Sequence, residues 1–182
     1  MKFNPTGLPG VILIEPTVFG DERGFFMETY QERLFAQAGL PTHYVQDNQS
    51  GSRQGTLRGL HYQIQQTQGK LVRAIVGEVF DVAVDLRRSS PAFGKWTSVH
   101  LSASNKSILW VPPGFAHGIY VLSEWAEIFY KATEFYAPQH ERSLAWNDPQ
   151  LKISWPLIDG QSPTLSPKDA TGALLADAEV FE

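Results

Sequence analysis

Residues 69–86 read Gly-Lys-Leu-Val-Arg-Ala-Ile-Val-Gly-Glu-Val-Phe-Asp-Val-Ala-Val-Asp-Leu, and this stretch decides the fold class. It contains two runs rich in β-branched and aliphatic residues, 69–76 and 78–86, with Gly77 between them. Such residues favour strands, and glycine favours the turns that separate strands. The second run alternates imperfectly, which is compatible with a central strand that buries its two acids, Asp81 and Asp85.

Similar short runs continue along most of the chain and are bounded by Gly, Pro, Asn and Ser. The expected strands are 44–49, 56–63, 69–76, 78–86, 95–101, 106–111, 116–122 and 125–133. Regularly spaced short strands predict an antiparallel sandwich or barrel. Before them we expect short strands at 11–14 and 25–30, and a helix over 31–38 that stops at Gly39.

The length of 182 residues predicts a single domain over 1–182. Its tail, from about residue 141, has a looser pattern. Ser166 and Asp169, with Pro167 between them, form a helix-start signal, so a short helix is expected over 166–175.

Composition excludes several classes of function. The net charge is −4 and no Lys/Arg-rich run is present, so nothing favours nucleic-acid binding. The absence of cysteine excludes disulfides, thiolate catalysis and zinc–sulfur sites. No segment reaches about 18 consecutive apolar residues, so we expect no membrane partner and a cytoplasmic protein.

A polar cluster lies in the strand expected over 56–63 and at the start of the next one. It brings together Arg58, His61 and Lys70. Side chains alternate between the two faces of a strand, so Arg58 and His61 should point to opposite faces. They can converge only if Gly59 supplies a bulge or bend, and a cluster that needs such a backbone is more typical of a site than of a solvated edge.

His117 is the second histidine whose surroundings indicate a site, because the stiff loop 112–116 precedes it. Small β-barrels with a similar loop often bind a metal, usually with two further histidines two residues apart. Here Gln63 stands at that spacing from His61, so we expect no metal. Arg23 and Arg73 are candidate residues for binding a diphosphate.

Two other polar features have equally ordinary interpretations. The segment 46–48 (Gln-Asp-Asn) ends an apolar strand and suits either recognition of a sugar or base edge or a plain turn. Tyr130, taken alone, is an ordinary core residue.

Together these motifs resemble the dTDP-4-dehydrorhamnose 3,5-epimerase family. The resemblance rests on segments 20–26, 46–48, 57–63, 68–73, 77–87, 113–118, 130–131, 146–148 and 168–170, in order along the chain. It implies a cupin-type antiparallel jelly-roll β-barrel with short peripheral and C-terminal helices, a homodimer, and no metal or cofactor.

The resemblance also implies roles for individual residues. It makes His61 the general base, Tyr130 the general acid, and Asp169 the partner of the base. We choose Lys70 as the donor to the substrate oxyanion. The substrate-contacting positions implied are Arg23, Glu28, Gln46, Asp47, Asn48, Arg58, Lys70, His117, Glu141 and Lys168.

The implied reaction is epimerisation at C3 and C5 of dTDP-4-dehydro-6-deoxy-D-glucose to dTDP-4-dehydro-L-rhamnose, in dTDP-L-rhamnose biosynthesis for cell-surface polysaccharide. One ketone acidifies both C–H bonds, so one base and one acid on opposite faces of the ring can invert both centres. The alternatives are a related 3-epimerase, 5-epimerase or ketoisomerase, a metal-dependent cupin, and a non-catalytic nucleotide-sugar binder.

Overall fold

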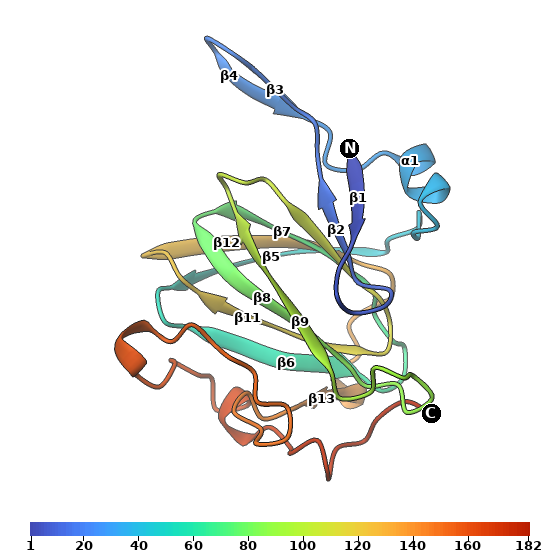
Figure 1. Cartoon of the computed structure of the whole chain (residues 1–182), viewed down its shortest axis with the longest axis vertical. Helices are drawn as coiled ribbons and strands as arrows, with labels where there is room; N and C mark the ends of the chain where they lie inside the picture. The colour runs from blue at the N-terminus through green and yellow to red at the C-terminus, as the bar shows by residue number, and fades with distance from the viewer.

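The computed structural model describes all residues 1–182, and two antiparallel sheets packed face to face form its body (Figure 1). The larger sheet contains, in spatial order, β1 (Lys2–Pro5), β2 (Ile12–Glu15), β10 (Ile108–Val111), β7 (Lys70–Val76), β12 (Trp125–Ala132) and β5 (Gln46–Arg53). The smaller sheet contains β13 (Glu141–Ser143), β6 (Leu57–Gln63), β11 (Phe115–Val121), β8 (Glu78–Asp85) and β9 (Trp96–Ser102). All eight strands expected from residue 44 onward are present, which confirms the predicted mainly-β jelly-roll architecture.

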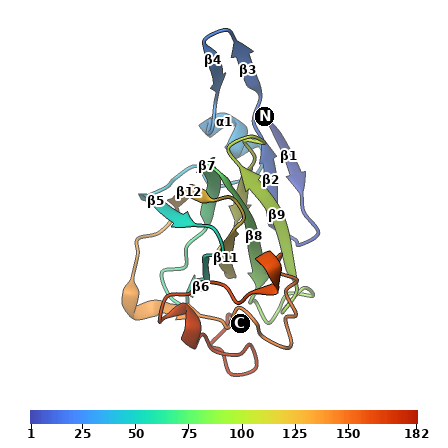
Figure 2. The same cartoon turned by 90° about the vertical axis from the view of Figure 1, so that its left-hand side faces the viewer.

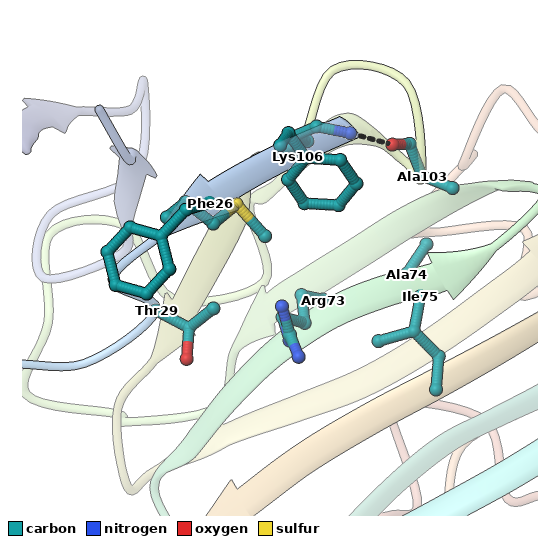
Figure 3. Close-up of a pocket in the computed structure, with 9 residues that line it drawn as sticks. Phe26, Thr29, Arg73, Ala74, Ile75, Ala103 and Lys106 are labelled. Atoms are coloured by element: carbon teal, nitrogen blue, oxygen red, sulfur yellow. Dashed lines mark hydrogen bonds between the residues drawn. The ribbon is translucent and has the colours of Figure 1, made fainter. Parts of the chain in front are cut away.

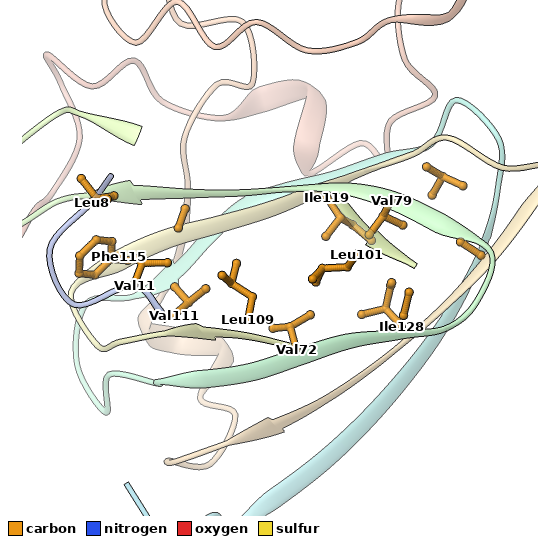
Figure 4. Close-up of a cluster of buried hydrophobic side chains, with 14 of the residues drawn as sticks. Leu8, Val11, Val72, Val79, Leu101, Leu109, Val111, Phe115, Ile119 and Ile128 are labelled. Atoms are coloured by element: carbon orange, nitrogen blue, oxygen red, sulfur yellow. The ribbon is translucent and has the colours of Figure 1, made fainter. Parts of the chain in front are cut away.

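The main hydrophobic core lies between the two sheets (Figure 4). Val72 and Leu109 contribute from the larger sheet, and Leu101 and Ile119 from the smaller one. Strand β8 is central in its sheet, and both of its acids are fully buried. The interpretation of its imperfect alternation as a buried central strand is therefore confirmed.

The N-terminal segments differ in part from expectation. Helix α1 (Glu32–Gln37) is capped by the Gln31 side chain and ends before Gly39, which has φ +72°, as its sequence predicts. The strand expected over 25–30 is shorter: β4 (Gly24–Met27) pairs with β3 (Val18–Asp21). This hairpin projects from the sandwich (Figures 1 and 2). No helix in the structure has the length and apolar character needed to cross a membrane.

The C-terminal tail has little regular structure but packs closely on the outer face of the smaller sheet. Leu144, Leu151, Trp155 and Leu175 are buried there. Its regular elements are the short 3-10 helices η1 (Pro138–His140), η2 (Ile158–Gly160) and η3 (Asp169–Thr171).

The helix expected over 166–175 is therefore only the three-residue η3. Ser166 still stabilises the turn that leads into η3, since its hydroxyl accepts a hydrogen bond from the Asp169 backbone N–H, although Lys168 occupies the N-cap position. The chain becomes extended at Gly172, and Ala173 pairs with Leu144. Tertiary pairing thus ends the turn before a helix can propagate.

Strand β6 contains the bulge that its polar cluster requires. His61 pairs with His117 of β11, but Arg58 pairs with Ile119, so β6 holds one extra residue between these two pairs. Gly59 lies at this point with φ +118°. A Cβ on it would lie 2.6 Å from the Gly118 Cα, so only glycine fits.

Gly59→Ala is expected to lower the free energy of unfolding by roughly 2–4 kcal/mol, because it adds backbone strain and a backbone clash. Urea unfolding followed by tryptophan fluorescence measures the change. Gly7→Ala is the matched control, since a Cβ there meets nothing within 4 Å. Equal stability of the two variants would contradict this account of the bulge.

Candidate active site

A cavity of about 320 Å³ opens between the two sheets. Strands β5, β7 and β12 form one wall, β6 and β11 form the other, and the tail near η3 closes one side. Seven of the residues predicted for the site line it: Asn48, Arg58, His61, Lys70, His117, Tyr130 and Asp169. Segments distant in the sequence therefore converge on one polar cavity.

His61 and Asp169 form a close pair at the floor of this cavity. The His61 Nε2 lies 2.5 Å from the Asp169 Oδ1, and the Asp169 side chain is only 4% exposed. Burial raises the pKa of Asp169, but hydrogen bonds from His61, Ser166 and the Gly59 backbone N–H outweigh it and bring this pKa to about 2. Asp169 is thus ionised at neutral pH, and His61 keeps Nδ1 free for a ligand.

Lys70 and Tyr130 lie on the wall opposite His61. Burial lowers the pKa of Lys70 to about 8, although Glu141 and Asp81 partly oppose that effect. Burial and the nearby Glu141 raise the pKa of Tyr130, so its hydroxyl keeps its proton at neutral pH. The cavity therefore has a nitrogen base on one wall and two proton-bearing groups on the other.

Glu141 and Lys168, both predicted substrate contacts, form an ion pair beside the cavity. Glu141 also accepts a hydrogen bond of 2.7 Å from the Tyr136 hydroxyl. Burial raises the pKa of Glu141, but the bonds from Lys168 and Tyr136 hold it below its usual value. The negative charge of Glu141 raises the pKa of both Lys70 and Tyr130, so the pair lies close to these two residues.

Side-chain alternation along β5 directs the neighbouring side chains of segment 46–48 to opposite faces of the sheet. Asn48 lines the cavity, and its buried Nδ2 has no hydrogen-bond partner within the chain. Gln46 supports it through a bond of 2.7 Å to its Oδ1. Asp47 is exposed and pairs with Lys131 at 2.9 Å, so its side chain is not brought to the cavity.

Arg58 and His117 are held by neighbours from other strands. Arg58 is exposed at the cavity mouth and donates to the Ser52 hydroxyl at 2.8 Å. His117 is bonded through Nε2 to Asp81, at 2.8 and 3.0 Å from its two oxygens. No group of three or more His, Cys, Asp and Glu side chains is placed to hold a metal.

Arg23 and Glu28 do not join this cavity within one chain. Arg23 lies in the turn of the β3–β4 hairpin, 90% exposed and paired with Asp21 at 2.6 Å, and Glu28 is exposed just beyond β4. The expectation that these residues bind substrate beside His61 therefore cannot be met by one chain in this conformation.

Arg73 lines a different cavity of about 350 Å³ beneath the hairpin (Figure 3). It lies opposite Phe129 on β12, with its guanidinium over the aromatic ring. Arg73 therefore does not line the cavity of His61, and its role in holding the diphosphate stays a prediction.

Ser166 is a cavity residue that the sequence prediction missed. Its hydroxyl donates to the Asp169 Oδ2 at 2.7 Å, so it holds the carboxylate that pairs with His61. The sequence did contain a signal for Ser166, because its spacing from Asp169 indicates the start of a helix and therefore predicts contact between the two residues. Gln49 and Ser50 were also missed, and nothing in their strand pattern distinguishes them.

Ser166→Ala is expected to raise the pKa of Asp169 by roughly one unit, because it removes a donor that stabilises the charged carboxylate. Carboxyl ¹³C NMR titration, with the signal assigned through Asp169→Asn, measures this. Ser143→Ala is the control: Ser143 pairs opposite His61, but its Oγ has no partner. An unchanged Asp169 pKa in Ser166→Ala would contradict the prediction.

Comparison with known proteins gives a consistent result along the whole chain. It is 61% identical to the dTDP-4-dehydrorhamnose 3,5-epimerase of Pseudomonas aeruginosa over 182 residues, covering 100% of this chain and 99% of that protein. The dTDP-6-deoxy-D-glucose-3,5-epimerase of Legionella pneumophila, solved in complex with dTDP-4-keto-L-rhamnose, superposes with a TM-score of 0.94. It is 51% identical, and the match covers 98% of this chain and 94% of that one.

A more distant solved structure is ChmJ, a 3'-monoepimerase from Streptomyces bikiniensis in complex with dTDP-quinovose. It is 34% identical with a TM-score of 0.88, covering 94% of this chain and 87% of that one. A family model described as dTDP-4-dehydrorhamnose 3,5-epimerase matches residues 5–177. The chain therefore belongs to the dTDP-4-dehydrorhamnose 3,5-epimerase family of isomerases.

Proposed function

We propose that this enzyme inverts C3 and C5 of dTDP-4-dehydro-6-deoxy-D-glucose to form dTDP-4-dehydro-L-rhamnose, in dTDP-L-rhamnose biosynthesis. The observation that carries the proposal is the placement of a His–Asp pair and a protonated tyrosine on opposite walls of one cavity. Inversion next to a ketone needs a base on one face of the sugar and a proton donor on the other.

His61 acts as the base in this proposal. With Asp169 ionised and bonded to Nε2, neutral His61 carries its proton on Nε2 and presents the Nδ1 lone pair to the C–H bond. When His61 takes the proton, the negative charge of Asp169 stabilises the imidazolium. The C4 ketone acidifies the C–H bonds at C3 and C5 in the same way, so the same base serves both carbons.

Tyr130 and Lys70 complete the reaction from the other wall. Tyr130 protonates the enolate on the face opposite His61, and its raised pKa ensures that the proton is present. Lys70 donates to the enolate oxygen O4, whose negative charge develops during proton abstraction. Because its pKa is about 8, Lys70 loses the positive charge that stabilises the enolate as the pH rises through that value.

The remaining cavity residues suit recognition of the substrate. Arg58 provides a cation at the mouth, and the unpartnered Nδ2 of Asn48 provides a donor. His117, Glu141 and Lys168 provide polar groups around the sugar. A donor at the enolate oxygen is already present in Lys70, so we propose that the reaction needs no metal.

A single-centre epimerase is the competing function, and the resemblance to the monoepimerase ChmJ makes it concrete. The much higher identity to a 3,5-epimerase favours inversion at both carbons. Product NMR in deuterated water distinguishes the two, because each inverted carbon acquires deuterium.

His61→Ala is expected to slow deuterium exchange at both C3 and C5 by roughly 10²–10⁴-fold while dTDP binding persists. Tyr130→Phe should impair completed inversion more than the initial exchange, since it removes only the acid. NMR of the substrate in deuterated water measures both steps. Exchange at the wild-type rate in His61→Ala, or unchanged inversion in Tyr130→Phe, would refute the respective assignment.

We also propose that the enzyme is a homodimer in which each β3–β4 hairpin reaches the cavity of the partner subunit. The hairpin projects into solvent with Phe19, Phe25 and Phe26 each at least 60% exposed (Figure 2). Such an aromatic surface is unusual on a monomer. A second copy would both cover it and supply the Arg23 and Glu28 that the cavity lacks.

The cytoplasmic location of the enzyme remains a prediction.

Mixing Arg23→Ala with His61→Ala is expected to restore activity that neither variant has alone. If the sites are shared between subunits, heterodimers contain one complete site, and about one quarter of all sites recover. Activity measured after the subunits have exchanged tests this. A mixture as inactive as its components, with exchange verified by mass spectrometry, would contradict the shared site.

A further inference from the structure

Asn48 carries a buried hydrogen-bond donor that nothing in the chain satisfies. It lies on β5 directly opposite Tyr130 of β12, and it lines the cavity. Its Nδ2 is buried and has no hydrogen-bond partner. An unpaired buried N–H group is costly, and such groups in native proteins are almost always bonded. The Asn48 amide therefore indicates a partner that enters the cavity.

The orientation of this amide decides what kind of partner it can bind. A side-chain amide presents an acceptor oxygen on one side and an N–H donor on the other, and a half-turn exchanges them without changing its shape. The neighbour that fixes Asn48 is Gln46, whose Nε2 donates to the Asn48 Oδ1 at 2.7 Å. While Gln46 presents Nε2, Asn48 must turn Oδ1 toward it and keep Nδ2 free.

Gln46 carries an amide too, and the main chain fixes its orientation. Its Oε1 accepts a hydrogen bond of 3.0 Å from the Tyr136 backbone N–H. A backbone N–H can only donate, so this contact accepts Oε1 and excludes Nε2. The polarity of one main-chain group is thus passed through Gln46 to Asn48.

The segment 135–137, which supplies this N–H, is held by a second glutamine. Gln63 of β6 is only 4% exposed. Its Oε1 accepts from the Ala137 N–H at 2.8 Å, and its Nε2 donates to the Phe135 carbonyl at 3.2 Å. These two bonds flank Tyr136 and fix the direction of its backbone N–H. The smaller sheet therefore anchors the group that orients the amides of β5.

Gln46 itself is not placed to contact a ligand in this chain. It is absent from the cavity lining, and both ends of its amide already have partners. This position suits a residue that acts through Asn48.

We propose that Gln46 is a positioning residue that turns the Asn48 amide so that its Nδ2–H faces an acceptor oxygen of the bound sugar, beside Tyr130. The cavity consequently recognises a hydrogen-bond acceptor at this point. The identity of the ligand rests on the proposed function, whereas the amide orientation is a property of the enzyme alone. Gln46 touches no substrate atom.

Gln46→Glu tests the proposal with almost no change in shape. Its carboxylate can accept from the Tyr136 N–H but cannot donate to Asn48, so the Asn48 amide should turn and direct Oδ1 at the ligand. The Kd for dTDP-6-deoxy-D-glucose, which has no ketone and does not react, is expected to rise roughly 10–100-fold in calorimetry. An unchanged Kd would overturn the proposal.

Gln54→Glu is the matched control for this measurement. It introduces the same charge at an exposed glutamine just beyond β5, whose Nε2 donates to the Leu122 carbonyl and which is not in the cavity lining. Its Kd should equal that of the wild-type enzyme. A rise as large as in Gln46→Glu would assign the effect to charge alone and contradict the proposal.

NMR at saturating ligand separates a turned amide from local repulsion by the new carboxylate. In the wild-type enzyme the Asn48 Hδ2 protons should show nuclear Overhauser effects to sugar protons, and Gln46→Glu should abolish them. If they persist in Gln46→Glu, the amide has not turned, and the proposal is wrong.

The wild-type enzyme alone provides a test if Gln46→Glu does not fold. Binding of dTDP-6-deoxy-D-glucose should shift the side-chain amide signals of Asn48, assigned through Asn48→Asp. Overhauser effects from the Gln46 amide to the ligand would make Gln46 a direct contact and overturn the inference. Deuterium exchange in His61→Ala tests the proposed reaction separately, so failure of the reaction and failure of this inference give different results.

Discussion

At Gly59 the backbones of β6 and β11 approach so closely that a single methyl group would collide with the neighbouring strand. The site depends on this contact. The extra residue that β6 accommodates there changes the direction of alternation, so that Arg58 and His61 both border the cavity. The Gly59 backbone N–H also donates to Asp169, which links the bulge to the partner of the base.

Charge in the cavity is balanced by pairs drawn from different parts of the chain. Asp169 from the tail bonds to His61, Glu141 pairs with Lys168, and Asp81 bonds to His117. Few charges are left without a partner in a region of reduced solvent access, where an uncompensated charge is costly. Lys70 differs, because it lines the cavity with a lowered pKa and can respond to a developing oxyanion.

The hairpin and the tail make different contributions to the two sides of the molecule. The tail, although irregular, is fixed by buried residues such as Leu144 and Leu175, and it therefore positions Ser166 and Asp169 accurately. The hairpin has no comparable core and presents its aromatic residues outward. A site completed by such an arm would be formed only on association, which couples assembly to activity.

The sequence by itself determined the mainly-β architecture, the eight strands between residues 44 and 133, and the need for a bulge at Gly59, but not the short strand β13 in the tail. These features follow from local alternation, from residue propensity and from the steric freedom of glycine. The resemblance to a family added candidate roles for residues far apart in the chain, such as Tyr130 and Asp169. Only the tertiary structure decided which of these side chains share a cavity. It separated Asp47 from Asn48, placed Arg23 on a projecting arm and joined Asp81 to His117, because such contacts depend on register and packing between strands that are distant in sequence.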